Sequence, residues 1–274
     1  MPTMSDPRTF ALAAEPGRES EDAIALGAGV AVVVDGAGLP ASMRAGCRHS
    51  VAWYARVLAE AFRDRLEDRR VPMTDALAGA IAAVAALHSD MCDLGAGSPS
   101  GTVAAWRVDG DALDHLVLSD ASIVLVMADG EVRESTDLRI DDAVDRGAAE
   151  VLGGRMVDPA EEARVRFAAL DRMRNVPGGF WCCHVDPAAA AEAVTGRVLL
   201  DDLAGVVASS DGGTRGFRSF DAHSLDRFGG LALAGDLSRI AEEIRASERA
   251  APDRARVKRH DDIALVLGAV AHER

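Results

Sequence analysis

Residues 32–38 read VVVDGAG, in which a continuous apolar run ends on Asp35 and is followed at once by Gly36. Continuous β-branched residues are typical of a strand that is covered on both faces. An Asp-Gly pair is also common in exposed turns, so a simple turn is the alternative interpretation of this stretch taken alone. The stretch therefore predicts a buried strand and leaves open why that strand ends on a carboxylate.

The same pattern recurs at other apolar runs. GVVASSDGG ends its run on Asp211, and LVLSD ends its run on Asp120. HDDIALVL reverses the order, so that Asp261 and Asp262 open the run. If neighbouring strands are antiparallel, a strand that ends on an acid and a strand that begins on one place both acids at the same sheet edge.

Asp35, Asp211 and Asp261 are therefore expected to meet, although they lie far apart in the sequence. Crowded carboxylates repel one another and require a cation. Mg²⁺ and Mn²⁺ prefer oxygen ligands, and two such ions that share a ligand can activate water and polarise a phosphoryl oxygen. The alternative is a set of unrelated turn acids, but the repeated placement at strand ends favours a metal centre.

The composition bounds the possible functions. The chain has 274 residues, of which 49% are hydrophobic, so it can bury a sizeable core. The net charge of −14 argues against a nucleic-acid partner and fits poorly with binding to anionic membranes. There is no apolar run long enough to span a membrane, and the N-terminus lacks the pattern of an export signal. We therefore expect a cytoplasmic protein, with a monomer favoured.

Periodicity predicts helices in residues 41–67 and 74–87, within 137–174, and after Asp236. Between them lie short strands with tight turns, above all in residues 102–132, and further strands at GFWCCHV (179–185), GVVASSDGG and the C-terminal run. A small helix is expected after Asp186. This order predicts one α+β domain over 1–274, with helices outside antiparallel sheets and a lid or flap insertion at about 137–179.

The cysteines and histidines show no obvious site in the sequence. Cys47, Cys92, Cys182 and Cys183 lack metal-ligand spacing, and the seven histidines include no close pair. Reduced, structural cysteines and structural or solvated histidines are the expectation. Other routes to phosphoryl or acyl chemistry are excluded, because there is no cysteine-nucleophile phosphatase loop, no nucleotide P-loop and no Gly-x-Ser-x-Gly elbow.

Five segments in order resemble the metal-dependent type 2C protein phosphatases. These are GRESEDA (17–23), VVVDGAG, SGTVAAWRV with LVLSDASIVLV, VVASSDGG and RHDDIALVL, and NVPGGFW resembles bacterial, especially actinobacterial, members. The resemblance covers almost the whole chain. It implies a β-sandwich of antiparallel sheets flanked by helices on both sides. It also implies hydrolysis of phosphoserine and phosphothreonine with Mn²⁺ or Mg²⁺, by a metal-activated water and without a phosphoenzyme.

The resemblance also assigns roles by position. Asp35 matches the acid that bridges two metal ions, and the Gly36 carbonyl matches a ligand of the second ion. Asp211 and Asp261 match the other ligands of the first ion.

Three further matches complete the set. Glu21 and Asp22 match the Glu-Asp pair that holds the second ion directly or through water. Asp120 matches the site of a third, weaker ion in bacterial members. Arg18 lies near the place of an arginine that binds the substrate phosphate, and a surface charge is the alternative for it.

The chain also departs from the family pattern. Ala37 stands where many eukaryotic members have histidine, Gly38-Leu39 replaces a glycine pair, and Ser20 replaces a common Asn. Asp262 stands where Asn is usual. Because successive strand side chains point to opposite faces, Asp261 is the expected ligand, and Asp262 is expected to accept backbone hydrogen bonds or meet solvent. Replacing Asp262 by Asn is therefore expected to be mild.

The sequence thus predicts a metal-dependent serine/threonine phosphatase that acts on a phosphorylated protein. The alternative is a weakly active or inactive regulatory module of the same fold that binds a phosphoprotein, which the altered loop around Ala37 and Leu39 leaves open.

Overall fold

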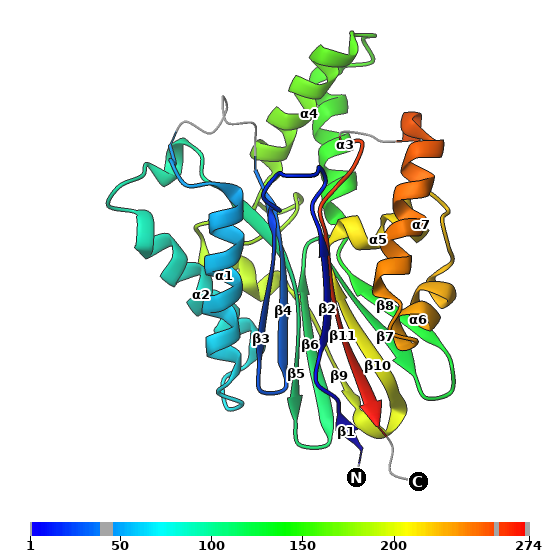
Figure 1. The fold of residues 1–274 in the computed structure, drawn as a ribbon. Helices are drawn as coiled ribbons and strands as arrows, with labels where there is room; N and C mark the ends of the chain where they lie inside the picture. Colours follow the sequence, from blue (N-terminus) through cyan, green and yellow to red (C-terminus); the bar gives the residue numbers. More distant parts are fainter. Residues whose placement is uncertain (1, 39–45, 255–257, 272–274) are drawn as a thin grey trace.

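The computed structural model describes residues 2–38, 46–254 and 258–271. Its strands form two antiparallel sheets (Figure 1). The five-stranded sheet has the order β3 (Asp22–Gly27), β4 (Val30–Ala37), β5 (Ser100–Asp109), β6 (Ala112–Leu118) and β9 (Val194–Leu199). The six-stranded sheet has the order β1 (Thr3–Met4), β11 (Ile263–Ala271), β10 (Leu203–Ser209), β7 (Ser122–Met127) and β8 (Val132–Thr136), and β2 (Arg8–Leu12) also pairs with β11.

Strand β4 shows why its sequence is apolar throughout. Val32 and Val34 pack toward the helices outside the five-stranded sheet, whereas Ala31 and Val33 face the core between the two sheets. All four are fully buried. The continuous apolar run is therefore the consequence of two covered faces, and the turn interpretation of Asp35-Gly36 is wrong, since both residues lie within β4.

Helices cover the outer face of each sheet. On one side α1 (Val51–Leu66) packs against β3, β4 and β5, and α2 (Met73–His88) packs against α1 and β6. On the other side α5 (Asp211–Arg218), α6 (Leu225–Leu233) and α7 (Leu237–Ala250) pack on the six-stranded sheet. The predicted fold class, an α+β sandwich of antiparallel sheets flanked by helices, is confirmed.

Helices α3 (Arg139–Leu152) and α4 (Pro159–Met173) pack against each other and rise above the upper end of the sheets in Figure 1. They lie in the segment for which a lid was predicted. The same end of the molecule carries the C-terminal ends of β4 and β10 and the start of β11 (Figure 1).

Several predicted boundaries differ from the structure. Helix α1 begins at Val51, with Ser50 as its N-cap, and the proposed start of that helix at residue 41 lies outside the described residues. The GFWCCHV strand is wrong: this segment forms only isolated bridges, Arg174 with Phe180 and Gly101 with Cys183.

The remaining structure consists of short elements. The described ranges contain four 3-10 helices, η2 (Leu94–Ala96), η3 (Pro187–Glu192), η4 (Leu200–Asp202) and η5 (Pro252–Arg254). The small helix predicted after Asp186 is η3, and Asp186 caps it as expected. Among the helices of the described ranges, none combines the length and apolar character that a bilayer crossing requires.

Candidate metal centre

Asp22 and Asp35 lie directly opposite each other on neighbouring strands, because the register of β3 and β4 pairs these two residues. Like charges in opposite positions destabilise a sheet. Burial raises the pKa of both carboxyl groups well above the usual range, and the charge of Asp211 raises both further. The repulsion between the two carboxylates is therefore unfavourable, and a bound cation would reduce it.

At Gly36, the segment that precedes β3 lies close against β4. The amide of Gly36 donates a hydrogen bond to the carbonyl of Glu21 at 3.1 Å. A Cβ at this position would lie 2.4 Å from that carbonyl oxygen and 2.6 Å from Cγ1 of Val51. Only glycine therefore permits this approach, which places Glu21 beside the end of β4.

Asp211 joins the second sheet to this pair. It lies two residues beyond β10, at the first position of α5, and its amide donates to Oδ2 of Asp35 at 3.3 Å. A Cβ on the next residue, Gly212, would lie 1.8 Å from the carbonyl oxygen of Asp262. The close packing of α5 on the start of β11 thus depends on glycine, and it brings Asp211 and Asp35 together across 176 residues of sequence.

Asp261 and Asp262 have different surroundings. Burial and the charge of Asp211 raise the pKa of Asp261 to about 6. Asp262 instead accepts two backbone hydrogen bonds, from the amide of Ala14 at 2.7 Å and from the amide of Glu21 at 2.8 Å. Of the two predicted environments for Asp262, the backbone hydrogen bonds are therefore the one observed.

Lys258, the only lysine of the chain, lies among these acids. Its Nζ is 3.1 Å from Oδ1 of Asp261 and 3.6 Å from Oε2 of Glu21. Burial lowers the pKa of Lys258, but the charges of Asp261 and Asp35 outweigh this effect and hold the pKa above its usual value. The sequence does not reveal the contact with Glu21, because Glu21 lies far from Lys258 along the chain.

A buried ionic network contacts the backbone of Asp261. Glu248 of α7 is fully buried, and its carboxylate pairs with Arg245 at 2.8 Å, Arg215 at 3.1 Å and His260 at 2.6 Å. Arg245 also donates to the backbone carbonyl of Asp261. The network fixes the chain on which Asp261 is carried.

Asp120 lies two residues beyond β6, after Ser119, which adopts a left-handed conformation with φ of 68°. Burial and the charge of Asp211 raise the pKa of Asp120 to about 7. The backbone carbonyl of Asp120 accepts a hydrogen bond from Arg218 of α5 at 3.2 Å. Asp141 at the start of α3 also raises the Asp120 pKa, so this acid lies between the central cluster and the α3–α4 hairpin.

In the described part of the chain, no hydrogen bond or ion pair joins the Arg18 side chain to these acids. Arg18 is exposed on the segment between β2 and β3, and its amide donates to the carbonyl of Glu15 at 3.2 Å. Ser20, which replaces the Asn usual in the family, accepts a hydrogen bond from the amide of Asp22 at 3.1 Å through its hydroxyl. The departure at Leu39 lies outside the described residues.

The structure therefore brings Asp22, Asp35 and Asp211 together, with Glu21 and Gly36 beside Asp35. The charge of Asp211 also raises the pKa values of Asp120 and Asp261. The donors are all carboxylate or carbonyl oxygens, which are the ligands that Mn²⁺ and Mg²⁺ prefer. Oδ2 of Asp22 is buried without a hydrogen-bond partner among the described residues. This donor set fits a hard divalent cation.

A second cluster of potential metal ligands consists of cysteines and histidines. Cys47, His49, His88 and Cys92 come together in space, although their spacing in the chain shows no familiar metal motif. All four cysteines lie within the described ranges, and no disulfide joins them there.

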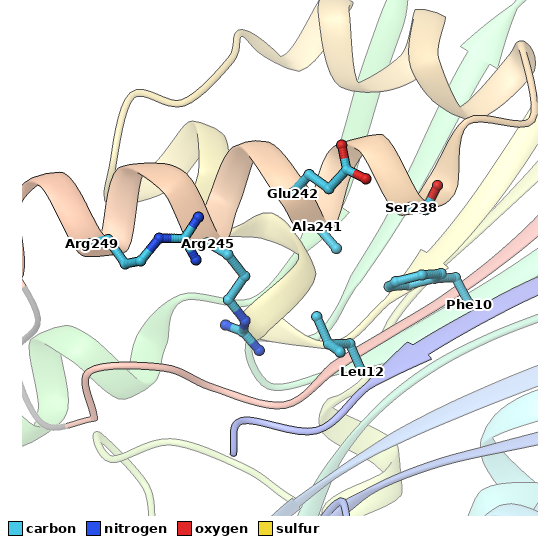
Figure 2. A pocket seen from close by; sticks show the side chains of 7 residues that line it. All are labelled: Phe10, Leu12, Ser238, Ala241, Glu242, Arg245 and Arg249. Carbon is cyan, nitrogen blue, oxygen red and sulfur yellow. The ribbon is translucent and has the colours of Figure 1, made fainter. Parts of the chain in front are cut away.

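A surface pocket lies between β2 and α7 (Figure 2). Its lining residues are Phe10, Leu12, Ser238, Ala241, Glu242, Arg245 and Arg249. None of the sequence-predicted site residues contributes to this lining, so the pocket is not the candidate site.

No protein-family model matches the sequence, and no curated protein matches it either. Solved structures do match. The serine/threonine phosphatase PstP/Ppp of Mycobacterium tuberculosis has a TM-score of 0.64 at 16% identity, over 98% of this chain and 100% of that chain. The catalytic domain of PstP in complex with two manganese ions has a TM-score of 0.59 at 16% identity, over 99% and 100%.

A structure of the serine/threonine phosphatase Stp1 from Staphylococcus aureus has a TM-score of 0.59 at 13% identity, and the match covers 98% of this chain and 96% of that chain. All three matches extend over nearly the full length of both chains. At this level of identity they establish the architecture, and this chain has the fold of these bacterial serine/threonine phosphatases.

Proposed function

We propose that this chain is a metal-dependent phosphatase that hydrolyses phosphoserine and phosphothreonine in phosphoproteins. The observation that carries the proposal is the meeting of acids from both sheets at one end of the sandwich. Asp35 of one sheet accepts a hydrogen bond from the amide of Asp211, which follows β10 of the other sheet, and Asp22 faces Asp35 in register. The similarity in fold to bacterial serine/threonine phosphatases supports the same activity.

The residues present would hold Mn²⁺ or Mg²⁺ in two positions. Asp35 would be shared, with Asp211 and Asp261 on one side. Glu21, Asp22 and the Gly36 carbonyl would lie on the other side, as direct ligands or through water. Asp120 would hold a third, weaker ion. When bound, these ions supply the activation of water and the polarisation of the phosphoryl group.

Other residues of the chain hold this arrangement in place. Asp262 accepts the amide of Glu21 and so fixes the strand end that carries Glu21 and Asp22. The ionic network of Glu248, Arg215 and Arg245 holds the segment of Asp261. Arg18, exposed three residues before Glu21, would bind the substrate phosphate through its guanidinium.

We further propose that residues 1–274 act as one phosphatase domain in the cytoplasm and that the segment 137–179 serves as its lid. The charge of Asp141 in α3 acts on Asp120, which supports a position of the hairpin next to the site. A phosphoprotein bound at the acids would then meet α3 and α4.

One observation favours the alternative of an inactive regulatory module. Lys258 supplies a positive charge 3.1 Å from Asp261, and a built-in cation of this kind can replace part of the charge that a metal ion would bring. Such a module would bind a phosphoprotein without hydrolysing it.

An assay of phosphate release separates these two functions. The chain is incubated with p-nitrophenyl phosphate and with a phosphothreonine peptide, with and without Mn²⁺. We expect turnover of both only with Mn²⁺, and a loss of several orders of magnitude in Asp35→Asn and Asp211→Asn. A folded chain that binds the peptide in the presence of Mn²⁺ without releasing phosphate would instead identify the regulatory module.

A further inference from the structure

A cluster of two cysteines and two histidines lies at the ends of α1 and α2, outside the acidic centre. Its members are Cys47, His49, His88 and Cys92, and one potential ligand atom from each lies within 4.8 Å of all the others. Cys47 and His88 are buried, and His49 and Cys92 are half-buried. Thiol and imidazole groups are the ligands of structural zinc sites.

The separations between sulfur and nitrogen match those around a tetrahedral ion. Sγ of Cys47 lies 3.5 Å from Nδ1 of His49 and 3.4 Å from Nδ1 of His88, and Sγ of Cys92 lies 3.5 Å from Nδ1 of His49. With Zn–S bonds of about 2.3 Å and Zn–N bonds of about 2.0 Å at tetrahedral angles, sulfur and nitrogen ligands lie about 3.5 Å apart. These three sulfur–nitrogen separations are thus those expected between ligands of one zinc ion.

Two segments of the chain supply these four groups. Cys47 and His49 precede the N-cap of α1, whereas His88 is the last residue of α2 and Cys92 follows it. The ring of His49 stacks on Trp53 at 4.1 Å between centroids, and Trp53 also lies 5.3 Å from the ring of His88. One indole of α1 therefore packs against both imidazoles and restricts their orientation.

Backbone hydrogen bonds join the same two segments. The amide of Gly46 donates to the carbonyl of Ala96 at 3.2 Å, and the amide of Asp93 donates to the carbonyl of Gly46 at 2.8 Å. The Cys-x-His segment and the segment after α2 are thus already aligned. An ion between them would add a cross-link to an existing contact.

We propose that Cys47, His49, His88 and Cys92 bind one zinc ion in a closed tetrahedral site. Thiolate and imidazole ligands favour zinc over Mn²⁺ and Mg²⁺, whereas the carboxylate cluster has the opposite preference. The chain would then carry two metal sites of different chemistry. With four protein ligands and no open position, the zinc site is structural.

The zinc site would also restrict the position of a strand that contributes to the acidic centre. His49 lies two residues before Val51, and Val51 packs so closely on Gly36 that a Cβ there would lie 2.6 Å from its Cγ1. The zinc ion would fix the start of α1 and, through Val51, the end of β4. The proposal itself rests on the cysteine and histidine geometry and not on the phosphatase function.

Two other states of the same cluster make different predictions. Cys47 and Cys92 are close enough for a disulfide to be considered, since their sulfur atoms lie within 4.8 Å. The four groups could also remain a hydrogen-bonded thiol and imidazole cluster. Neither state binds metal, so metal content separates them from the zinc site.

The test is the zinc content of the full chain, purified in reductant without added metal and measured by inductively coupled plasma mass spectrometry. We expect one zinc per chain in the wild type, and its loss in Cys92→Ser and in His88→Gln. Cys182→Ser is the matched control, because Cys182 is a buried thiol in a different cluster, with Ala143 and Phe180. This control and Asp211→Asn should both keep zinc, so a failed phosphatase site is distinguishable from a failed zinc site.

Cobalt provides a second readout in the wild-type chain, which does not depend on the folding of a variant. Exchange of zinc for Co²⁺ should give the sulfur-to-cobalt charge-transfer band and the visible bands of a tetrahedral site. A wild-type chain without zinc and without this band would overturn the proposal. So would a Cys92→Ser variant that retains zinc, or a Cys47–Cys92 disulfide found by peptide mapping of protein that was never exposed to oxidant.

Discussion

At the scale of single residues, two adjacent acids that directly precede β11 have different surroundings. Asp261 belongs to the cluster of raised pKa values, together with Asp22 and Asp35. Asp262 uses both carboxylate oxygens to accept backbone amides. The same residue type therefore serves as a candidate ligand at one position and as a structural acceptor at the next.

The two hydrogen bonds of Asp262 add an expectation about the stability of Asp262→Asn, beside the mild effect predicted from the sequence. Asparagine offers one acceptor oxygen and places an amide group against the other backbone N–H, so one buried donor loses its partner. We expect a loss of about 1–3 kcal/mol in the free energy of unfolding. Asp261→Asn removes a repelling charge and should leave stability without Mn²⁺ unchanged or higher, while it weakens Mn²⁺ binding.

Urea unfolding and Mn²⁺ titration of the two variants, side by side, measure both effects. Should Asp262→Asn keep wild-type stability while Asp261→Asn loses it, the two residues have exchanged roles and the register assigned to this segment is wrong.

At the scale of elements, much of the fold follows from the sequence. The apolar run before Asp35 and the amphipathic pattern after Asp236 correspond to β4 and α7. The GFWCCHV segment was wrongly predicted as a strand, because its apolar residues pack against a helix and not within a sheet. Phe180 and Cys182 pack against α3, and the backbone of Cys182 exchanges two hydrogen bonds with the side chain of Asn175 instead of a strand.

The candidate site was predictable where a short motif carries it, and not where distant elements combine. The acids at strand ends are visible in sequence because antiparallel pairing implies that they meet. The contact of Lys258 with Glu21 required the packing of the chain after α7 against the segment that precedes β3. The Cys-x-His segment meets His88 and Cys92 only because α1 and α2 pack side by side, and 38 residues separate the two halves of that cluster (positions 50–87).

Helix α5 gives a test at this scale, because it approaches β11 through Gly212. A Cβ at Gly212 would lie 1.8 Å from the carbonyl oxygen of Asp262, so Gly212→Ala must displace α5 and with it Asp211. We expect destabilisation of about 1–3 kcal/mol and weakened Mn²⁺ binding. Calorimetric titration and thermal unfolding measure the two quantities.

Gly230→Ala in α6 is the matched control, since a Cβ there has no neighbour within 4 Å and alanine favours a helix. This variant should bind Mn²⁺ as the wild type does and should be slightly more stable. If Gly212→Ala behaves like Gly230→Ala, the close approach of α5 to β11 does not position Asp211.

At the scale of the whole molecule, folding brings several carboxyl groups together. At neutral pH the charged forms of these groups lower the stability of the folded chain. Without a divalent ion, the pKa values of Asp261 and Asp120 rise from 3.8 to about 6 and about 7. The folded chain then binds more protons than the unfolded chain between these values. The contribution of these acids to the free energy of unfolding therefore falls as the pH rises from about 4 to about 7.

Thermal unfolding of the desalted chain measures this pH dependence. We expect Tm to fall between about pH 5 and about pH 7.5, a smaller fall in Asp120→Asn, and a smaller fall in the wild type with Mn²⁺. The same slope in Asp120→Asn as in the wild type would show that the protonation of this acid is not linked to folding.

The central claim is that acids of both sheets form a divalent-metal centre beside Lys258. Because Lys258 is the only lysine, reductive methylation with ¹³C-formaldehyde labels it and the α-amino group alone. The N-terminal strand pairs Thr3 with Ala271, at the opposite end of β11 from Asp261, so the α-amino signal is an internal reference. The account predicts that substoichiometric Mn²⁺ broadens the Lys258 methyl signal selectively, and that Asp35→Asn abolishes the effect. Equal broadening of both signals, or unchanged broadening in Asp35→Asn, would contradict it.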